Sequence, residues 1–313
     1  MPIYLKDADF IDWRTLKVRR THIEVSPGPE GGLRFPAAIP KGGKVLDCRG
    51  RIVTKSFVVG HHHIYSALAR GMPAPRKAPR DFSELLKFVW WNLDKKLDLA
   101  MVRASALACG VEAARCGTTF IIDHHASPNA VSGSLHVIAE ALEEVGLSHL
   151  LCYELSVRDG ERRWREGLAE TESYLAARQG LLGLHASFTV DDKVLAAARS
   201  SAERHGTGFH VHVAEDPCDQ QDSLRRYGKR VIRRFHEAGL LDSPKTLLAH
   251  CLHLDAAERR VVKKSRAWVA QNTESNQNNN VGLFDPRGLG ERILIGTDGM
   301  HSDAPASARA AYL

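Results

Sequence analysis

The sequence lacks any apolar run of about 18 residues, the length needed to cross a bilayer. Its N-terminus also lacks the basic-then-apolar pattern of a secretion signal. The six cysteines are scattered, and no two of them form a CxxC pair. Because most of them lie in apolar segments, we expect reduced thiols in a cytoplasmic protein that does not contact a membrane.

The sequence has no block of one charge sign, although its formal net charge is +6. Basic and acidic residues alternate closely, as in Arg158-Asp159-Gly160-Glu161-Arg162-Arg163. Such interleaving is typical of a solvated surface and does not form the basic stripe that nucleic acid requires. We therefore expect no nucleic-acid partner.

The first 55 residues differ in character from the rest of the chain. Short β-type segments at residues 3–5, 21–25 and 44–47 surround a stretch rich in proline and glycine at residues 27–32. This pattern predicts that residues 1–55 form a β-appendage, and that the remainder, residues 56–313, forms a separate and larger domain.

A regular alternation of β-type and helical segments begins at Phe57. Helix-period stretches at residues 99–116, 133–145 and 193–205 each end beside a glycine, the usual helix stop. Between such stretches lie eight apolar runs, at residues 58–63, 118–123, 149–154, 181–185, 208–212, 246–250, 268–271 and 293–298. Eight such units predict the α/β class and a (β/α)₈ barrel. An open doubly wound sheet is the alternative, but the glycine-rich phosphate turn expected of it is missing.

Residues able to bind metals stand at the polar ends of these runs. His61 and His63 are two residues apart on a strand, so they share one face and offer a half-site for a metal such as zinc. In a barrel of parallel strands the carboxyl ends meet at one face, where the active site lies. Those ends carry His61/His63, Asp123-His124-His125, Glu154, His185, His210/His212/Glu215, His250, Gln271-Asn272 and Asp298.

These motifs resemble those of the amidohydrolase superfamily, in its deaminase-like branch with a single metal. The closer resemblance is to the SsnA-type aminohydrolases, and it rests on residues 61–71, 122–128, 212–216 and 275–282. The resemblance spans roughly residues 45–305 and implies a β-sandwich appendage formed in part by the N-terminal segment.

The same resemblance implies the role of each residue. It makes His61, His63, His212 and Asp298 ligands of one divalent metal ion. Zinc is the expected metal, with iron or manganese as the alternatives. Binuclear relatives have a modified lysine at the fourth strand end, where this chain has His185. Glu215 becomes the proton shuttle, His250 orients the nucleophile or polarises the substrate, and Asp298 also accepts a proton from water.

Further residues are candidates for substrate binding. His185 and His125 follow apolar strands, and Arg70 could pair with a substrate carboxylate or lie on the surface. Trp91 could stack on a heterocycle, or it could anchor a helix to the barrel together with Trp90.

The expected activity is hydrolysis of a non-peptide carbon–nitrogen bond, such as deamination of a cyclic amidine or N-heterocycle by metal-bound hydroxide. Two alternatives stay open: dechlorination at the same type of carbon, and a truncated barrel without catalytic activity. We also expect a homo-oligomer. Relatives continue beyond the eighth strand, so we expect a fragment that lacks most of its final helix and exposes Ile293 and Ile295.

Overall fold

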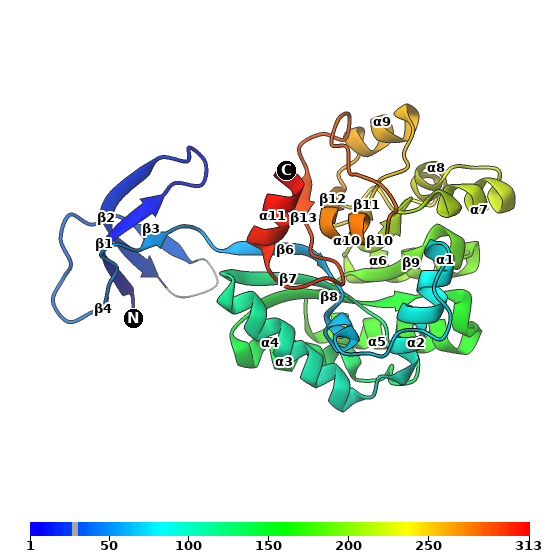
Figure 1. Ribbon diagram of the computed structural model, residues 1–313, viewed down its shortest axis with the longest axis horizontal. Helices are drawn as coiled ribbons and strands as arrows, with labels where there is room; N and C mark the ends of the chain where they lie inside the picture. Colours follow the sequence, from blue (N-terminus) through cyan, green and yellow to red (C-terminus); the bar gives the residue numbers. More distant parts are fainter. Residues whose placement is uncertain (27–30) are drawn as a thin grey trace. The chain divides into compact units, whose positions relative to one another are not determined.

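The computed structural model describes residues 1–26 and 31–313, so most of the predicted 27–32 stretch lies outside the described residues. It divides into two compact units, Met1–Ser56 and Phe57–Leu313 (Figure 1). No helix in the described part of the chain combines the length and the hydropathy that crossing a membrane demands.

The N-terminal unit is a five-stranded sheet in the order β3-β2-β1-β4, with β5 also paired to β1. Strand β1 runs antiparallel to β2 and parallel to β4 and β5. The strands are β1 (Ile3–Ile11), β2 (Val18–Ser26), β3 (Gly32–Arg34), β4 (Lys44–Asp47) and β5 (Ile52–Val53). A small core of Ala8, Phe10, Ile23 and Cys48 holds the sheet together. The predicted β-type segments are confirmed, and membership of a sandwich stays a prediction.

The larger unit is built on an eight-stranded parallel sheet in sequential order, as the alternating pattern predicted. Its strands are β6 (Phe57–His62), β7 (Thr118–His125), β8 (Ser148–Leu155), β9 (Leu182–Ala186), β10 (Phe209–Val213), β11 (Leu247–His250), β12 (Trp268–Gln271) and β13 (Ile293–Ile295). Each strand is a short apolar run, which suits a sheet covered on both faces.

The barrel closes between its first and last strands. The His61 carbonyl accepts hydrogen bonds from the backbone N–H groups of Thr297 (3.0 Å) and Asp298 (3.1 Å). Glycine is required beside this seam, since a Cβ on Gly296 would lie 2.1 Å from Asn272 Oδ1. The closed (β/α)₈ barrel is therefore confirmed, and the open sheet is not formed.

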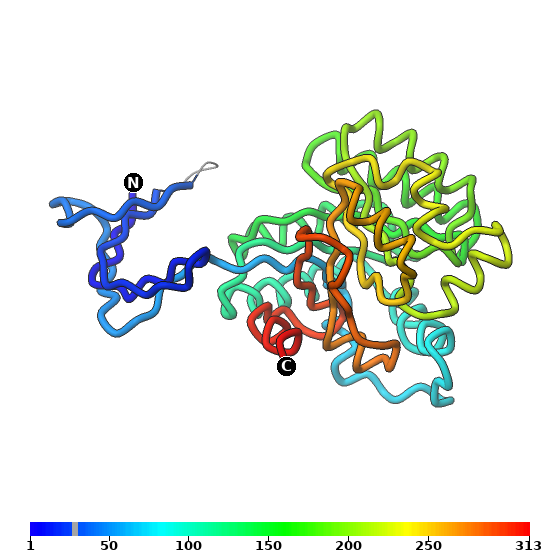
Figure 2. Tube along the Cα trace, turned by 90° about the horizontal axis from the view of Figure 1, so that it is seen from above, coloured from blue at the N-terminus to red at the C-terminus, as the bar shows by residue number. Residues whose placement is uncertain are grey.

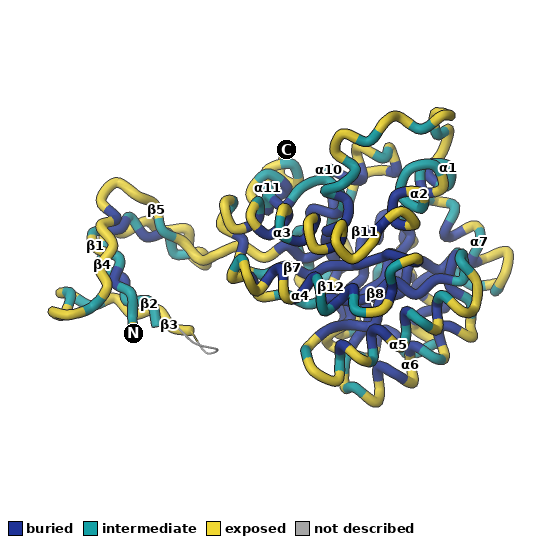
Figure 3. The backbone as a smooth tube through the Cα atoms, turned by 90° about the horizontal axis from the view of Figure 1, so that it is seen from below, coloured by how far each residue is buried: buried dark blue, intermediate teal, exposed yellow. Residues whose placement is uncertain are grey.

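Helices follow the strands and cover the outside of the barrel. The long ones are α3 (Leu99–Arg115), α4 (Ser134–Val145), α5 (Glu161–Ala177), α6 (Asp192–His205), α7 (Pro217–Tyr227), α8 (Val231–Glu237) and α9 (Ala256–Lys264). Aspartate caps start several of them: the Asp98 and Asp191 side chains accept from backbone N–H groups of α3 and α6. The main core lies between helices and strands, and burial is concentrated along the strands (Figure 3).

Short helical segments carry the chain over the carboxyl ends of the strands. They are η1 (Ile64–Ala69), α1 (Phe82–Leu85), η2 (Leu86–Trp90), α2 (Trp91–Leu93) and η3 (Asp94–Lys96) after β6, then η4 (Val157–Asp159), η5 (Ser187–Thr189) and α10 (Thr273–Asn278) after later strands. Because these segments sit where the strands end, they form the walls of any site there.

A nine-residue helix, α11 (Ala304–Tyr312), follows β13. That most of the final helix is missing stays a prediction. Helix α11 contacts β6 and β13, and the tube in Figure 2 shows it in red beside the strands. Ile293 and Ile295 are accordingly half-buried, not exposed.

Candidate active site

Several of the predicted site residues line one cavity at the carboxyl ends of the barrel strands. His63, His212, Glu215 and Asp298 line it together with aromatic side chains such as Trp91. They come from the ends of strands one, five and eight of the barrel, which lie far apart in the sequence. The barrel topology alone brings them together.

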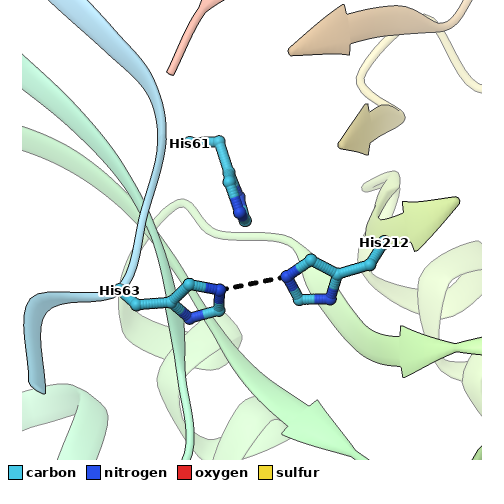
Figure 4. Close-up of side chains that lie close together, drawn as sticks. All are labelled: His61, His63 and His212. Carbon is cyan, nitrogen blue, oxygen red and sulfur yellow. Dashed lines mark hydrogen bonds between the residues drawn. The ribbon is translucent and has the colours of Figure 1, made fainter. Parts of the chain in front are cut away.

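Two of the histidines face each other in an arrangement that requires a cation. His63 Nδ1 lies 2.7 Å from the His124 carbonyl oxygen, and His212 Nδ1 lies 2.7 Å from that of His185. A carbonyl oxygen only accepts hydrogen bonds, so both Nδ1 atoms carry the proton. In the neutral rings both Nε2 atoms are then lone-pair acceptors, and they lie only 3.0 Å apart (Figure 4).

His61 and Asp298 lie beside this pair of histidines. His61 is fully buried, and its Nε2 has no hydrogen-bond partner among the described residues. The Oδ1 atom of Asp298 lies 3.5 Å from His61 Nε2 and 3.4 Å from His63 Nε2. Within the described residues these side chains form two overlapping groups of possible metal ligands, His61 with His63 and His212, and His61 with His250 and Asp298.

The three distances quoted are compatible with pairs of ligand atoms that share one metal ion. Zinc–nitrogen bonds of about 2.0–2.1 Å at tetrahedral angles place neighbouring ligand atoms roughly 3.3 Å apart. The atoms quoted above are separated by 3.0–3.5 Å. An ion at this point would also satisfy the unpartnered His61 nitrogen and offset the repulsion between the lone pairs of His63 and His212. The residues present therefore fit a divalent metal.

The protonation states suit metal binding as well. Burial lowers the pKa of His61 to about 3, lowers that of His63, and lowers that of His212 well below its ordinary value. All three rings are therefore neutral at pH 7, the form in which histidine binds metals. Burial opposes ionisation of Asp298, but the imidazoles of His61 and His250 outweigh it and hold the pKa of this carboxyl well below its usual range.

A second carboxyl group adjoins this cluster. Glu215 Oε2 lies 3.3 Å from His250 Nε2, and the Oδ2 atom of Asp298 lies 3.8 Å from the same nitrogen. Burial raises the pKa of Glu215 to about 7, so this carboxyl can take up and release protons near neutrality. His250 Nδ1 lies 2.8 Å from Asn276 Oδ1, which orients the ring.

The backbone around the site adopts a costly conformation at three positions. Ala214, His250 and Asp298 have positive φ angles of 46°, 70° and 51°, a region that residues with a Cβ rarely adopt. At Ala214 a buried carboxylate offsets this cost. Asp219 accepts hydrogen bonds from the backbone N–H groups of Ala214 (2.9 Å) and Phe188 (3.0 Å). This contact fixes the loop that follows β10.

The structure separates the four predicted substrate contacts into two pairs. His185 and Trp91 line the cavity, with ring centroids 6.0 Å apart. His125 is buried, and its Nε2 lies 2.9 Å from Ser127 Oγ. Arg70 has an exposed side chain that pairs with Glu112 at 3.3 Å. Neither His125 nor Arg70 is brought into the cavity.

Several cavity residues had no individual role in the sequence analysis. Asp94 lies outside the quoted motifs, whereas Tyr65 and Asn279 lie within residues 61–71 and 275–282 without a role of their own. Asn276 lies within the quoted 275–282 stretch, to which no individual role was assigned. His210 is one of the predicted strand-end histidines, and its Nε2 lies 2.7 Å from His61 Nδ1.

Comparison with known proteins agrees with the motifs. Residues 52–312 match the pattern of the amidohydrolase family. The chain belongs to the amidohydrolase family. Among solved structures, a triazine hydrolase variant superposes with a TM-score of 0.86 at 16% identity, covering 100% of this chain and 75% of that one. This structural likeness concerns the fold.

Curated amidohydrolase relatives include two deaminases. The chain is 30% identical over 224 residues to the 5-methylthioadenosine/S-adenosylhomocysteine deaminase of Desulfitobacterium hafniense, covering 69% of this chain and 50% of that protein. It is also 30% identical over 265 residues to the 5′-deoxyadenosine deaminase of Methanopyrus kandleri, covering 80% and 58% respectively. The chain thus spans between half and three fifths of the length of these two relatives.

Proposed function

We propose that this chain acts as a metal-dependent hydrolase of non-peptide carbon–nitrogen bonds, an aminohydrolase of a cyclic amidine or N-heterocycle. One observation carries the proposal: His63 and His212 direct two lone pairs at each other across 3.0 Å, inside a cavity that Glu215 and Asp298 also line. The names of the two deaminase relatives support an adenine-like ring as the class of substrate.

The proposed metal site has one ion and four ligands, His61, His63, His212 and Asp298. Three imidazoles and one carboxylate suit zinc, and iron or manganese are the alternatives. A bound divalent ion would supply Lewis acidity, which makes water a nucleophile near neutral pH.

The remaining roles belong to side chains beside the ligands. Glu215 transfers a proton to the departing nitrogen, because its carboxyl group titrates near neutrality. His250 stabilises the charge that develops at the attacked carbon, since its Nε2 lies 3.3 Å from Glu215 Oε2. Asp298 accepts a proton from water through its second carboxylate oxygen, Oδ2.

The cavity walls suit a flat, heteroaromatic substrate. Trp91 and His185 line the cavity with rings 6.0 Å apart, at an interplanar angle of 68°. An aromatic ring of this kind packs against a heterocycle by stacking or edge contacts. The heterocycle then lies between this wall and the reacting groups.

An ammonia-release screen of the zinc-loaded protein tests the proposed function. The panel contains purines and their nucleosides, pyrimidines, triazines and guanidino compounds. The control is Glu215→Gln protein loaded in the same way, which separates enzymatic release from spontaneous hydrolysis. Ammonia release from at least one heterocycle, absent in the control, is the expected result. No release from any compound by a folded, metal-loaded protein contradicts the proposal.

A further inference from the structure

One wall of the cavity carries two carboxyl groups that the proposed chemistry does not use. Glu154 at the end of β8 and Asp94 in η3 both line the cavity. Both residues are buried, with exposed fractions of 7% and 1%. Two buried acidic groups beside a substrate cavity are costly unless each finds a partner.

Arg158 lies between these two carboxyl groups and pairs with both of them. Its Nη2 atom is 2.5 Å from Asp94 Oδ2 and 3.4 Å from Glu154 Oε1. Its Nε atom is 3.4 Å from a third carboxylate, that of Asp159. The guanidinium is therefore surrounded by acidic groups, although its buried Nε and Nη1 atoms have no hydrogen-bond partner among the described residues. It is not among the residues lining the cavity, so this wall offers no free positive charge to a substrate.

The cluster still contains oxygen atoms that accept no hydrogen bond within the described residues. Asp94 Oδ1 is buried and has no hydrogen-bond partner among the described residues. Glu154 Oε2 lies 3.6 Å from the Nδ1 atom of His124, which is beyond hydrogen-bond length. Burial raises the pKa of Glu154 to about 8, so this group has a high affinity for a proton or a donor.

The cluster lies one side chain away from the proposed metal ligands. The His124 ring separates them, with its centroid 4.6 Å from that of His212 and its Nδ1 atom facing Glu154. Trp91 connects the two regions, because it lines the same cavity and Arg158 Cζ lies 5.2 Å from its ring centroid. A heterocycle that reacts at the ligands can therefore place a substituent against Glu154 and Asp94.

We infer that Glu154 is a specificity-determining residue, which accepts a hydrogen bond from a neutral or cationic substituent of the substrate, with Asp94 as a second acceptor. The inference rests on the proposed function and narrows its substrate class to heterocycles bearing an N–H or O–H group away from the scissile carbon. Substrates with an anionic group at that position bind poorly, because the two acidic side chains offer no positive charge and Arg158 does not line the cavity.

The test measures how affinity depends on the charge of one substituent. The probes are 5′-amino-5′-deoxyadenosine, adenosine and adenosine 5′-carboxylate, which share the adenine ring and carry a cationic, a neutral and an anionic group at the 5′ position. Calorimetry with zinc-loaded Glu215→Gln protein gives their affinities without turnover. We expect the cationic and neutral probes to bind more tightly than the anionic one by about tenfold or more. Equal affinity for the anionic probe, or no binding of the cationic and neutral probes, would overturn the inference.

A second substitution tests whether Glu154 causes the difference in affinity between the cationic and the anionic probe. Adding Glu154→Gln should reduce the ratio of cation to anion affinity by about tenfold, and Asp94→Asn serves in its place if that protein does not fold. Glu144→Gln is the matched control, because Glu144 is exposed and pairs with Arg103 on the outer surface. An unchanged ratio in the folded Glu154 variant contradicts the inference. Ammonia release by the wild-type protein is measured in parallel, so failure of the proposed function is recognised separately.

Discussion

His61 Nδ1 lies 2.7 Å from His210 Nε2, and both side chains are completely buried. For His61 to offer Nε2 to a metal, its Nδ1 has to carry the proton. His210 Nε2 then accepts a hydrogen bond from this N–H group. The other side of the His210 ring faces the Cys152 sulfur, with Nδ1 at 3.6 Å. A second imidazole therefore holds the first in the tautomer that binds metals.

Removing this acceptor should weaken metal binding. His210→Leu retains an apolar side chain of similar size but cannot accept the His61 proton, so metal affinity should fall about 10–100-fold. His210→Gln can present an oxygen near the lost nitrogen and should recover part of the affinity. Competition with a chromogenic chelator measures both values. Equal losses in the two variants would show that packing, not the hydrogen bond, is what His210 provides.

Glu215→Gln and His61→Ala should fail in different ways. The amide keeps the shape of Glu215 but cannot carry a proton, so turnover should fall on the order of 10²–10⁴-fold while the metal stays bound. His61→Ala removes a ligand, so it should lose the metal as well. Steady-state rates together with metal analysis of the purified proteins distinguish the two. Normal turnover by the Glu215 variant would refute its assignment as proton shuttle.

Much of the fold could be predicted from the sequence, because each barrel strand is an apolar run with its own polar end. The seventh run, residues 268–271, coincides with β12. The eighth run was predicted to reach residue 298, whereas β13 ends at Ile295. The difference arises because Gly296 closes against His61 and Asp298 turns into a positive φ angle, both consequences of barrel closure.

The site was predictable where it depends on strands and unpredictable where it depends on loops. Strand alternation places His61 and His63 on one side, so the sequence itself indicates their partnership. Asp94 and Asn276 lie in short helical segments whose direction depends on packing against the whole barrel. Arg70 illustrates the same limit, because its position after the first strand suggested a substrate contact while the fold directs it to Glu112.

Removal of the metal should destabilise the larger unit. A ligand that binds only the native state adds about 2.7 kcal/mol of stability at 100 times its dissociation constant. Chelator-treated protein should therefore melt at a lower temperature, and about one equivalent of zinc should restore the transition. Differential scanning calorimetry with metal analysis measures both effects. A requirement for two equivalents would contradict a site with a single ion.

The buried carboxyl of Asp219 should make stability depend on pH in a defined window. Burial raises its pKa from 3.8 to about 7 in the folded protein, although two backbone N–H groups oppose this. Between these values the native state binds a proton that the unfolded state has released, so stability falls as the pH rises from about 4 to 7.

Asp219→Asn isolates this contribution. The amide cannot accept from both Ala214 and Phe188, so the variant should be less stable than the wild type by about 1–3 kcal/mol at pH 4.5. The variant has no buried carboxyl group to ionise, however. The difference in free energy of unfolding between the two proteins should therefore shrink towards pH 7.5. Urea unfolding of both proteins at the two pH values measures this trend. Titration of the metal ligands affects both proteins alike and cancels in the comparison. A difference in free energy of unfolding that stays constant or grows with pH would show that Asp219 keeps an ordinary pKa in the folded protein.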